Sequence, residues 1–227
     1  MVSAPSYDPN RLASHDTAAV QEVWSELNED PERPLTNRAI GGDLYPPGSA
    51  FKLVVAAAAL ESGEYTAESV IPGPGVYDLP NSSAQMNNQA GGGQDPCGPD
   101  DESTLAEALR QSCNTSFAML GVDLGEEQLH ETAESFGFGQ RMEIPLSVTP
   151  SSLGSDLDDA QVATTSIGQY ETRVSPLQMA MVAGAFAHDG VVMEPQLVQS
   201  VRTSDLSPIA ELTPKELGQP LTASNAS

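Results

Sequence analysis

The chain has 227 residues, 39% of them apolar, and its 32 acidic residues outnumber the 9 basic ones to give a net charge of −23. This length and apolar content are sufficient for one globular domain, which we assign to residues 1–227. The strong negative charge repels phosphates and argues against nucleic-acid binding. The longest apolar run, LVVAAAAL at 53–60, is far shorter than the roughly 20 residues of a membrane-spanning helix, and the opening MVSAPSYDPN has no secretion-signal pattern.

Apolar residues at helical spacing, with helix-ending residues between them, predict six helices. They cover 17–27, 49–63, a segment capped by Ser103 that ends just before Ser112, 114–120, 126–136 and 176–188. Gly, Pro, Asn and Ser dominate 65–101, which is typical of irregular chain with short strands, and 151–159 is a polar loop. Residues 191–202 resemble two short strands broken at Pro195. Helices therefore dominate, with too few strands for a complete sheet.

Ser49 and Lys52 open the sharpest helix start, YPPGSAFK at 45–52. At a spacing of three residues both side chains project from the same helical face, so they can touch. A serine hydroxyl is a poor nucleophile until a base takes its proton, and a lysine in a dry cleft can have its pKa lowered enough to be that base. The pattern S-x-x-K is therefore a candidate nucleophile and general base.

The same two residues have a simpler interpretation, because S-x-x-K is frequent by chance. Ser49 would then be a helix cap and Lys52 a solvated lysine of the first turn. Two observations favour the catalytic hypothesis. Lys52 is one of only two lysines, the other being Lys215, and the apolar run that follows it predicts a buried helix.

A second candidate element is Ser112-Cys113-Asn114, placed between two predicted helices. Such a turn can present Ser112 and Asn114 on one side while Cys113 points away. The hydroxyl could then relay a proton and the amide could bind a substrate carbonyl. The alternative is an ordinary turn that links two helices.

Together these elements resemble the S-x-x-K and S-x-N motifs of penicillin-binding proteins. The segments YPPGSAFK and ALRQSCNTSFA carry the resemblance, which extends over VSAPSYDPN, NRAI, FGFG and SIGQYETRVSPLQMAMVAGAFAHDG. Nearly the whole chain is similar to class B enzymes, most of all to the actinobacterial penicillin-binding protein A group. Tyr170 departs from the pattern, because many relatives carry a glycine there.

The resemblance implies an α+β serine β-lactamase and penicillin-binding transpeptidase fold, and a D,D-transpeptidase that needs no cofactor. Ser49 would attack the penultimate D-alanine carbonyl of a peptidoglycan stem peptide, with Lys52 as general base. Ser112 would relay the proton to the leaving amine, and Asn114 would bind the substrate amide. β-Lactam antibiotics would acylate the same serine. The domain would be extracytoplasmic and held at the membrane by a segment outside this chain.

The third motif of the family, K-T-G or K-S-G, does not occur in the sequence. In the family it lies on a sheet strand that also supplies one amide of the oxyanion hole, so we expect that strand downstream of residue 227. The opening residues resemble the close of an early sheet strand. We therefore expect a partial domain whose sheet lacks strands at both ends, with doubtful activity in isolation.

Two other functions are compatible with the sequence. A D,D-carboxypeptidase or β-lactamase of the same superfamily would deacylate with water, but no E-x-x-L-N pattern follows Ser112, and the nearest match, EEQLH at 126–130, has a helical pattern. A non-catalytic penicillin-binding sensor or scaffold would suit the missing K-T-G. A K-T-G motif downstream would favour the enzyme.

Cys97 and Cys113 are too few for a disulfide scaffold and lack the spacing of a zinc site. From the residues alone they are either bridged or two unpaired side chains. The extracytoplasmic location that the resemblance implies would allow a bridge between them. The three histidines have no clustered partners in the sequence, so no metal site is predicted; they are His15, His130 and His188.

Overall fold

The computed structural model describes residues 2–88, 93–142 and 144–227, and most of their regular structure is helical. The α-helices are α1 (Thr17–Glu29), α2 (Lys52–Ser62), α3 (Leu105–Gln111), α4 (Asn114–Ser135), α5 (Asp159–Thr165), α6 (Pro176–Phe186) and α7 (Ala223–Ala226). The described residues also form three short 3-10 helices, η1 (Pro9–Leu12), η2 (Gly48–Phe51) and η3 (Pro99–Asp101).

The strands are short, and within the described ranges they pair only two by two, always antiparallel. The pairs are β1 (Val70–Pro72) with β4 (Glu102–Thr104), β2 (Val76–Asp78) with β3 (Gln85–Asn87), β5 (Val192–Met193) with β8 (Glu216–Gly218), and β6 (Ser200–Arg202) with β7 (Pro208–Glu211). The prediction of dominant helices with too few strands for a complete sheet is confirmed for this part of the chain.

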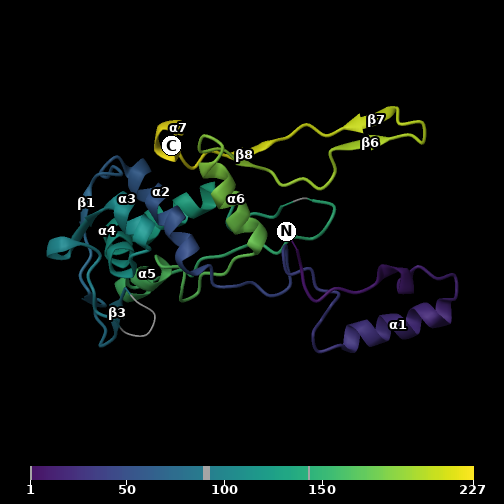
Figure 1. Ribbon diagram of the computed structural model, residues 1–227, viewed down its shortest axis with the longest axis horizontal. Helices are drawn as coiled ribbons and strands as arrows, with labels where there is room; N and C mark the ends of the chain where they lie inside the picture. The colour runs from purple at the N-terminus through teal and green to yellow at the C-terminus, as the bar shows by residue number, and fades with distance from the viewer. Residues whose placement is uncertain (1, 89–92, 143) are drawn as a thin grey trace.

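Helix α2 forms the centre of the core. Its sequence from Leu53 to Leu60 is apolar on every face, so the helix must be covered on all sides. It packs against α3, α4, α6 and α7, and its four consecutive alanines are buried. Figure 1 shows α2 in the body of the molecule, with α3 and α4 on one side of it and α6 on the other. The residue that opens this helix, Lys52, is therefore placed inside the body rather than on its surface.

Two segments extend from the body toward the same side in Figure 1. One is α1 with η1, and its Trp24 remains half exposed. The other is the β6–β7 hairpin, whose strand β7 is exposed along its whole length. The helical body therefore carries Ser49, Lys52 and the Ser112–Asn114 turn without these two segments.

Several helix ends lie where the sequence predicts them. Gly63 adopts a left-handed conformation, with φ 76°, and ends α2. Helix α3 ends at Gln111, directly before Ser112, and α6 begins at Pro176. The start of α2 differs in detail, because Ser49 lies in the 3-10 turn η2 and regular α-helix begins at Lys52.

The prediction of Ser103 as a helix cap is wrong. Ser103 lies in β4, where it pairs with Ile71, and the cap falls one residue later. Thr104 accepts a hydrogen bond from the backbone N–H of Glu107, which lies three residues on. The β1–β4 pairing keeps Ser103 extended, so the first helical turn starts after Thr104.

Helices also extend further than predicted. The expected interruption at 121–125 is confined to Gly125, with φ 81° and ψ 165°, so 114–135 form one kinked helix. The unpredicted helix α5 starts with a capping box between Asp158 and Gln161. Residues 65–101 are irregular chain with short strands, as predicted, apart from 89–92, which lie outside the described residues.

Candidate active site

The structure brings the four predicted site residues together where three helices meet. Ser49 lies in η2 and Lys52 opens α2. Ser112 is the C-cap of α3, with a left-handed conformation at φ 59° and ψ 44°, and Asn114 opens α4. The tight reversal at Ser112 turns the chain so that its oxygens and the Asn114 amide face Lys52, 60 residues earlier in the sequence.

Lys52 Nζ lies at the centre of a set of oxygen acceptors. It donates to the backbone oxygen of Ser112 at 2.6 Å and to Oδ1 of Asn114 at 2.8 Å. Two hydroxyl oxygens are also within reach, Ser112 Oγ at 3.2 Å and Ser49 Oγ at 3.3 Å. An ammonium group has three donors, whereas a neutral amine has two donors and a lone pair. The neutral form can therefore hold two of the acceptors and take a proton from a hydroxyl.

Burial determines the protonation of Lys52. The side chain is fully buried, and Nζ lies 5.7 Å from the centroid of the Phe117 ring. Desolvation lowers the pKa of Lys52 from 10.5 to about 8. The burial excludes the interpretation of Lys52 as a solvated lysine. The lowered pKa allows part of the lysine to be unprotonated near neutral pH.

Asn114 is held on both sides of its amide group. Its Oδ1 accepts from Lys52, and its Nδ2 donates to the backbone oxygen of Asn87 at 3.0 Å. Among the described residues, the second N–H of the amide has no protein partner. Because both assigned bonds fix the orientation of the amide, that N–H can be offered to a substrate carbonyl.

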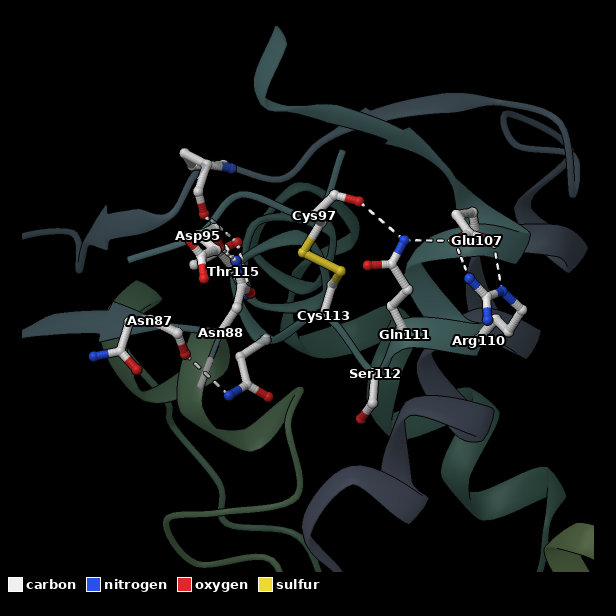
Figure 2. The surroundings of a disulfide bond; sticks show 12 residues. Asn87, Asn88, Asp95, Cys97, Glu107, Arg110, Gln111, Ser112, Cys113 and Thr115 are labelled. Atoms are coloured by element: carbon white, nitrogen blue, oxygen red, sulfur yellow. Dashed lines mark hydrogen bonds and ion pairs between the residues drawn. A yellow bond between two sulfur atoms is a disulfide. The ribbon is translucent and has the colours of Figure 1, made fainter. Parts of the chain in front are cut away.

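Ser112 and Asn114 both bind Lys52, whereas the side chain of Cys113 between them forms a disulfide with Cys97. The prediction that Ser112 and Asn114 share one side of the turn while Cys113 faces the other is therefore confirmed. Figure 2 shows the disulfide crossing from the turn to the loop around Asp95 and Cys97. The sequence alone did not decide whether the two cysteines are bridged. The disulfide ties the S-x-N turn to the chain beyond β3.

The backbone around Ser49 is fixed by a close approach that the sequence analysis missed. Gly48 N donates to the backbone oxygen of Gly168 at 2.9 Å. A Cβ at Gly168 would lie 2.1 Å from the oxygen of Gly48, and the φ of Gly168 is 70°. The available signal was glycine in the IGQY segment. In the same segment Tyr170 has φ 58°, a left-handed conformation that glycine adopts more readily than tyrosine.

The described residues contain no group of three or more His, Cys, Asp or Glu side chains that could hold a metal ion. The ring of His130 bonds the backbone oxygen of Gly154 at 2.8 Å. None of the described helices combines the length and the apolar character that a membrane crossing requires.

Known proteins are similar to this chain in both sequence and structure. The chain is 44% identical over 217 residues to the peptidoglycan D,D-transpeptidase PbpA of Mycolicibacterium smegmatis. The matched region covers 95% of this chain and 43% of that protein. The crystal structure of PBPA from Mycobacterium tuberculosis superposes with a TM-score of 0.91 at 38% identity, covering 99% of this chain and 51% of that one. The penicillin G acyl-enzyme complex of the same protein gives the same TM-score at 39% identity.

The chain thus spans about half the length of these proteins. A family model described as the penicillin binding protein transpeptidase domain matches residues 1–227. The α+β fold implied by the resemblance is confirmed by these neighbours. The chain therefore belongs to the family of penicillin-binding protein transpeptidase domains.

Proposed function

We propose that this chain supplies the nucleophile, the general base and the S-x-N turn of a serine peptidoglycan D,D-transpeptidase. The observation that carries the proposal is the position of Lys52 Nζ, which is buried and lies within 3.3 Å of both Ser49 Oγ and Ser112 Oγ. The relatives named D,D-transpeptidase and the penicillin G acyl-enzyme complex support this chemistry.

In the first half-reaction the neutral amine of Lys52 takes the proton of Ser49 as Oγ attacks the penultimate D-alanine carbonyl of a stem peptide. Asn114 donates its free N–H to the substrate amide. The peptide bond to the terminal D-alanine then breaks, and Ser112 passes its proton to the leaving nitrogen while Lys52 returns one to Ser112. The products are an acyl-enzyme on Ser49 and free D-alanine.

In the second half-reaction an amine of a neighbouring stem peptide attacks the ester carbonyl. Its proton travels back through the same two groups, Ser49 leaves as the hydroxyl, and a new peptide bond cross-links the stems. A β-lactam ring presents a similar carbonyl, but its leaving nitrogen stays tethered to the acyl group. The acyl-enzyme then persists, which makes β-lactams covalent inhibitors of this site.

The substrates of this reaction lie on the outer side of the plasma membrane, so we place the full-length protein there, anchored through a segment outside this chain. The Cys97–Cys113 disulfide supports this location, because such bridges persist in oxidising compartments. Peptidoglycan stem peptides and β-lactams are the proposed partners. The chemistry described above uses no cofactor.

A synthetic stem pentapeptide with an amine acceptor tests the proposal on the full-length protein. We expect release of D-alanine and formation of the acyl-transfer product, both lost in Ser49→Ala. D-Alanine released without any transfer product, at saturating acceptor, would instead identify a carboxypeptidase. Absence of D-alanine release together with absence of β-lactam labelling would favour a non-catalytic scaffold.

A further inference from the structure

Asn88, directly after β3, binds three separate segments of chain with one side chain. Its Oδ1 accepts from the backbone N–H of Thr115 at 3.0 Å and from Thr115 Oγ1 at 3.0 Å. Its Nδ2 donates to the backbone oxygens of Pro74 at 3.1 Å and Asp95 at 3.2 Å. A carboxamide has two donors and two acceptor sites, so this group is fully used.

These bonds are made at the first turn of α4, next to Asn114. Thr115 is fully buried, and its single hydroxyl proton is shared between Asn88 Oδ1 and the backbone oxygen of Pro74, which lies 2.7 Å from Oγ1. Asn87 and Asn114, the residues directly before Asn88 and Thr115, are also joined by a hydrogen bond, because Asn114 Nδ2 donates to the backbone oxygen of Asn87. Figure 2 shows Asn87, Asn88 and Thr115 on one side of the disulfide, with Gln111 on the other.

The start of α4 needs such an external partner. The N-cap of α4 is Cys113, whose side chain makes no capping hydrogen bond and is bound in the disulfide. A helix start leaves its first backbone N–H groups without partners, and these are usually satisfied by the oxygen of a capping side chain. Asn88 supplies that oxygen from another segment, to the N–H of Thr115.

We propose that Asn88 is a positioning residue for acylation of Ser49, an inference that rests on the function proposed above. It caps α4 in place of Cys113 and thereby holds Asn114 against Lys52. Asn114 then lies between two anchored residues. Cys113 before it is held by the disulfide, and Thr115 after it is held by Asn88. Removing the Asn88 amide leaves the disulfide intact but frees the first turn of α4 to shift from Lys52.

The test measures the second-order rate of acylation by a fluorescent penicillin in the full-length protein, at temperatures well below the unfolding midpoint of each variant. We expect Asn88→Ala to acylate about 10- to 100-fold more slowly than the unmodified protein, since small displacements of reacting groups have effects of this size. The matched control is Gln85→Ala, which removes an amide of the same hairpin that binds exposed Asp78. It should stay within about twofold.

A second control separates positioning from stability. Val192→Ala removes part of a fully buried side chain in β5, outside the site. If it lowers the unfolding midpoint as much as Asn88→Ala and still acylates at the unmodified rate, positioning is supported. Equal loss of rate in both variants would overturn the proposal, as would an Asn88→Ala rate within about twofold of the unmodified protein.

Asn88→Asp gives a signature that a purely structural role would not. Its carboxylate still accepts from Thr115 but meets the oxygens of Pro74 and Asp95 without a proton to donate. We expect slow acylation at neutral pH, and a rate relative to the unmodified protein that rises as the pH falls and the carboxyl group gains a proton. A ratio independent of pH would contradict the proposal. If the unmodified protein itself is not acylated, the proposed function fails first and this inference falls with it.

Discussion

Lys52 Nζ lies 3.2 Å from Ser112 Oγ and 3.3 Å from Ser49 Oγ, so one buried amine reaches both hydroxyls of the site. Under the function proposed above, this arrangement would let a single base serve both the attack on the substrate and the protonation of the leaving group. It depends on the turn at Ser112, which carries its hydroxyl back toward α2.

Replacing Lys52 by methionine should lower the acylation rate by about 100-fold or more, because the proposed general base is lost. Methionine suits the test because Lys52 is fully buried and alanine would leave a cavity. Lys52→Arg is the matched variant that keeps the charge, and it should be equally slow because a guanidinium is not deprotonated. Penicillin labelling measures both rates, and rapid acylation of Lys52→Arg would show that Lys52 is not the base.

The acylation rate should rise with pH and level off above about 8, the pKa to which burial lowers Lys52. The pH dependence of the folding stability also reflects the titration of Lys52. A lysine whose pKa is lower in the folded state binds fewer protons there than in the unfolded state, so its effect on stability becomes more favourable as the pH rises from about 8 to 10.5. Labelling rates across this range check the first statement. A rate unchanged through pH 8 would contradict the assignment of Lys52 as base.

Gly168→Ala should slow acylation and destabilise the fold by roughly 2 kcal/mol or more, because the new Cβ meets the backbone of Gly48 and the left-handed φ is strained. Gly184→Ala is the control. A Cβ there meets nothing within 4 Å, and in helix α6 it should stabilise by up to about 1 kcal/mol. Thermal unfolding and labelling measure both effects. Normal acylation by Gly168→Ala would show that this contact does not position Ser49.

Reduction of the Cys97–Cys113 disulfide should slow acylation beyond its effect on stability, because Cys113 lies between Ser112 and Asn114. The bridge joins residues 16 positions apart. By restricting the unfolded chain, a loop of this size stabilises the folded state by about 3 kcal/mol. Thiol alkylation of denatured, non-reduced protein should find no free cysteine. Two alkylated cysteines would exclude the bridge, and an unchanged acylation rate after reduction would exclude its catalytic relevance.

The sequence was sufficient to predict the site wherever spacing along one helix or turn determines geometry. Ser49 and Lys52 are three residues apart at a helix start, and Ser112 and Asn114 flank one residue of a turn. That the two pairs meet in space followed only from the family resemblance. Local patterns contain no information on which helices pack together, so the 2.8 Å contact between Lys52 and Asn114 had no signal of its own.

The residues that the sequence analysis missed act through tertiary contacts. Asn88 lies in a polar, irregular segment where asparagine is common, and its role depends on the approach of α4. Gly168 is required by the backbone of Gly48, which lies 120 residues earlier in the chain. Ser103 resembles a cap because a helical apolar pattern follows it, whereas its strand pairing with Ile71 leaves no trace in that pattern.

The most direct test of the account is to map the site of penicillin attachment in the full-length protein. After labelling with penicillin and proteolysis, mass spectrometry should place the whole adduct on the peptide that contains Ser49, and Ser49→Ala should carry none. An adduct on another serine, Ser112 included, or undiminished labelling of Ser49→Ala would contradict the assignment of Ser49 as the nucleophile.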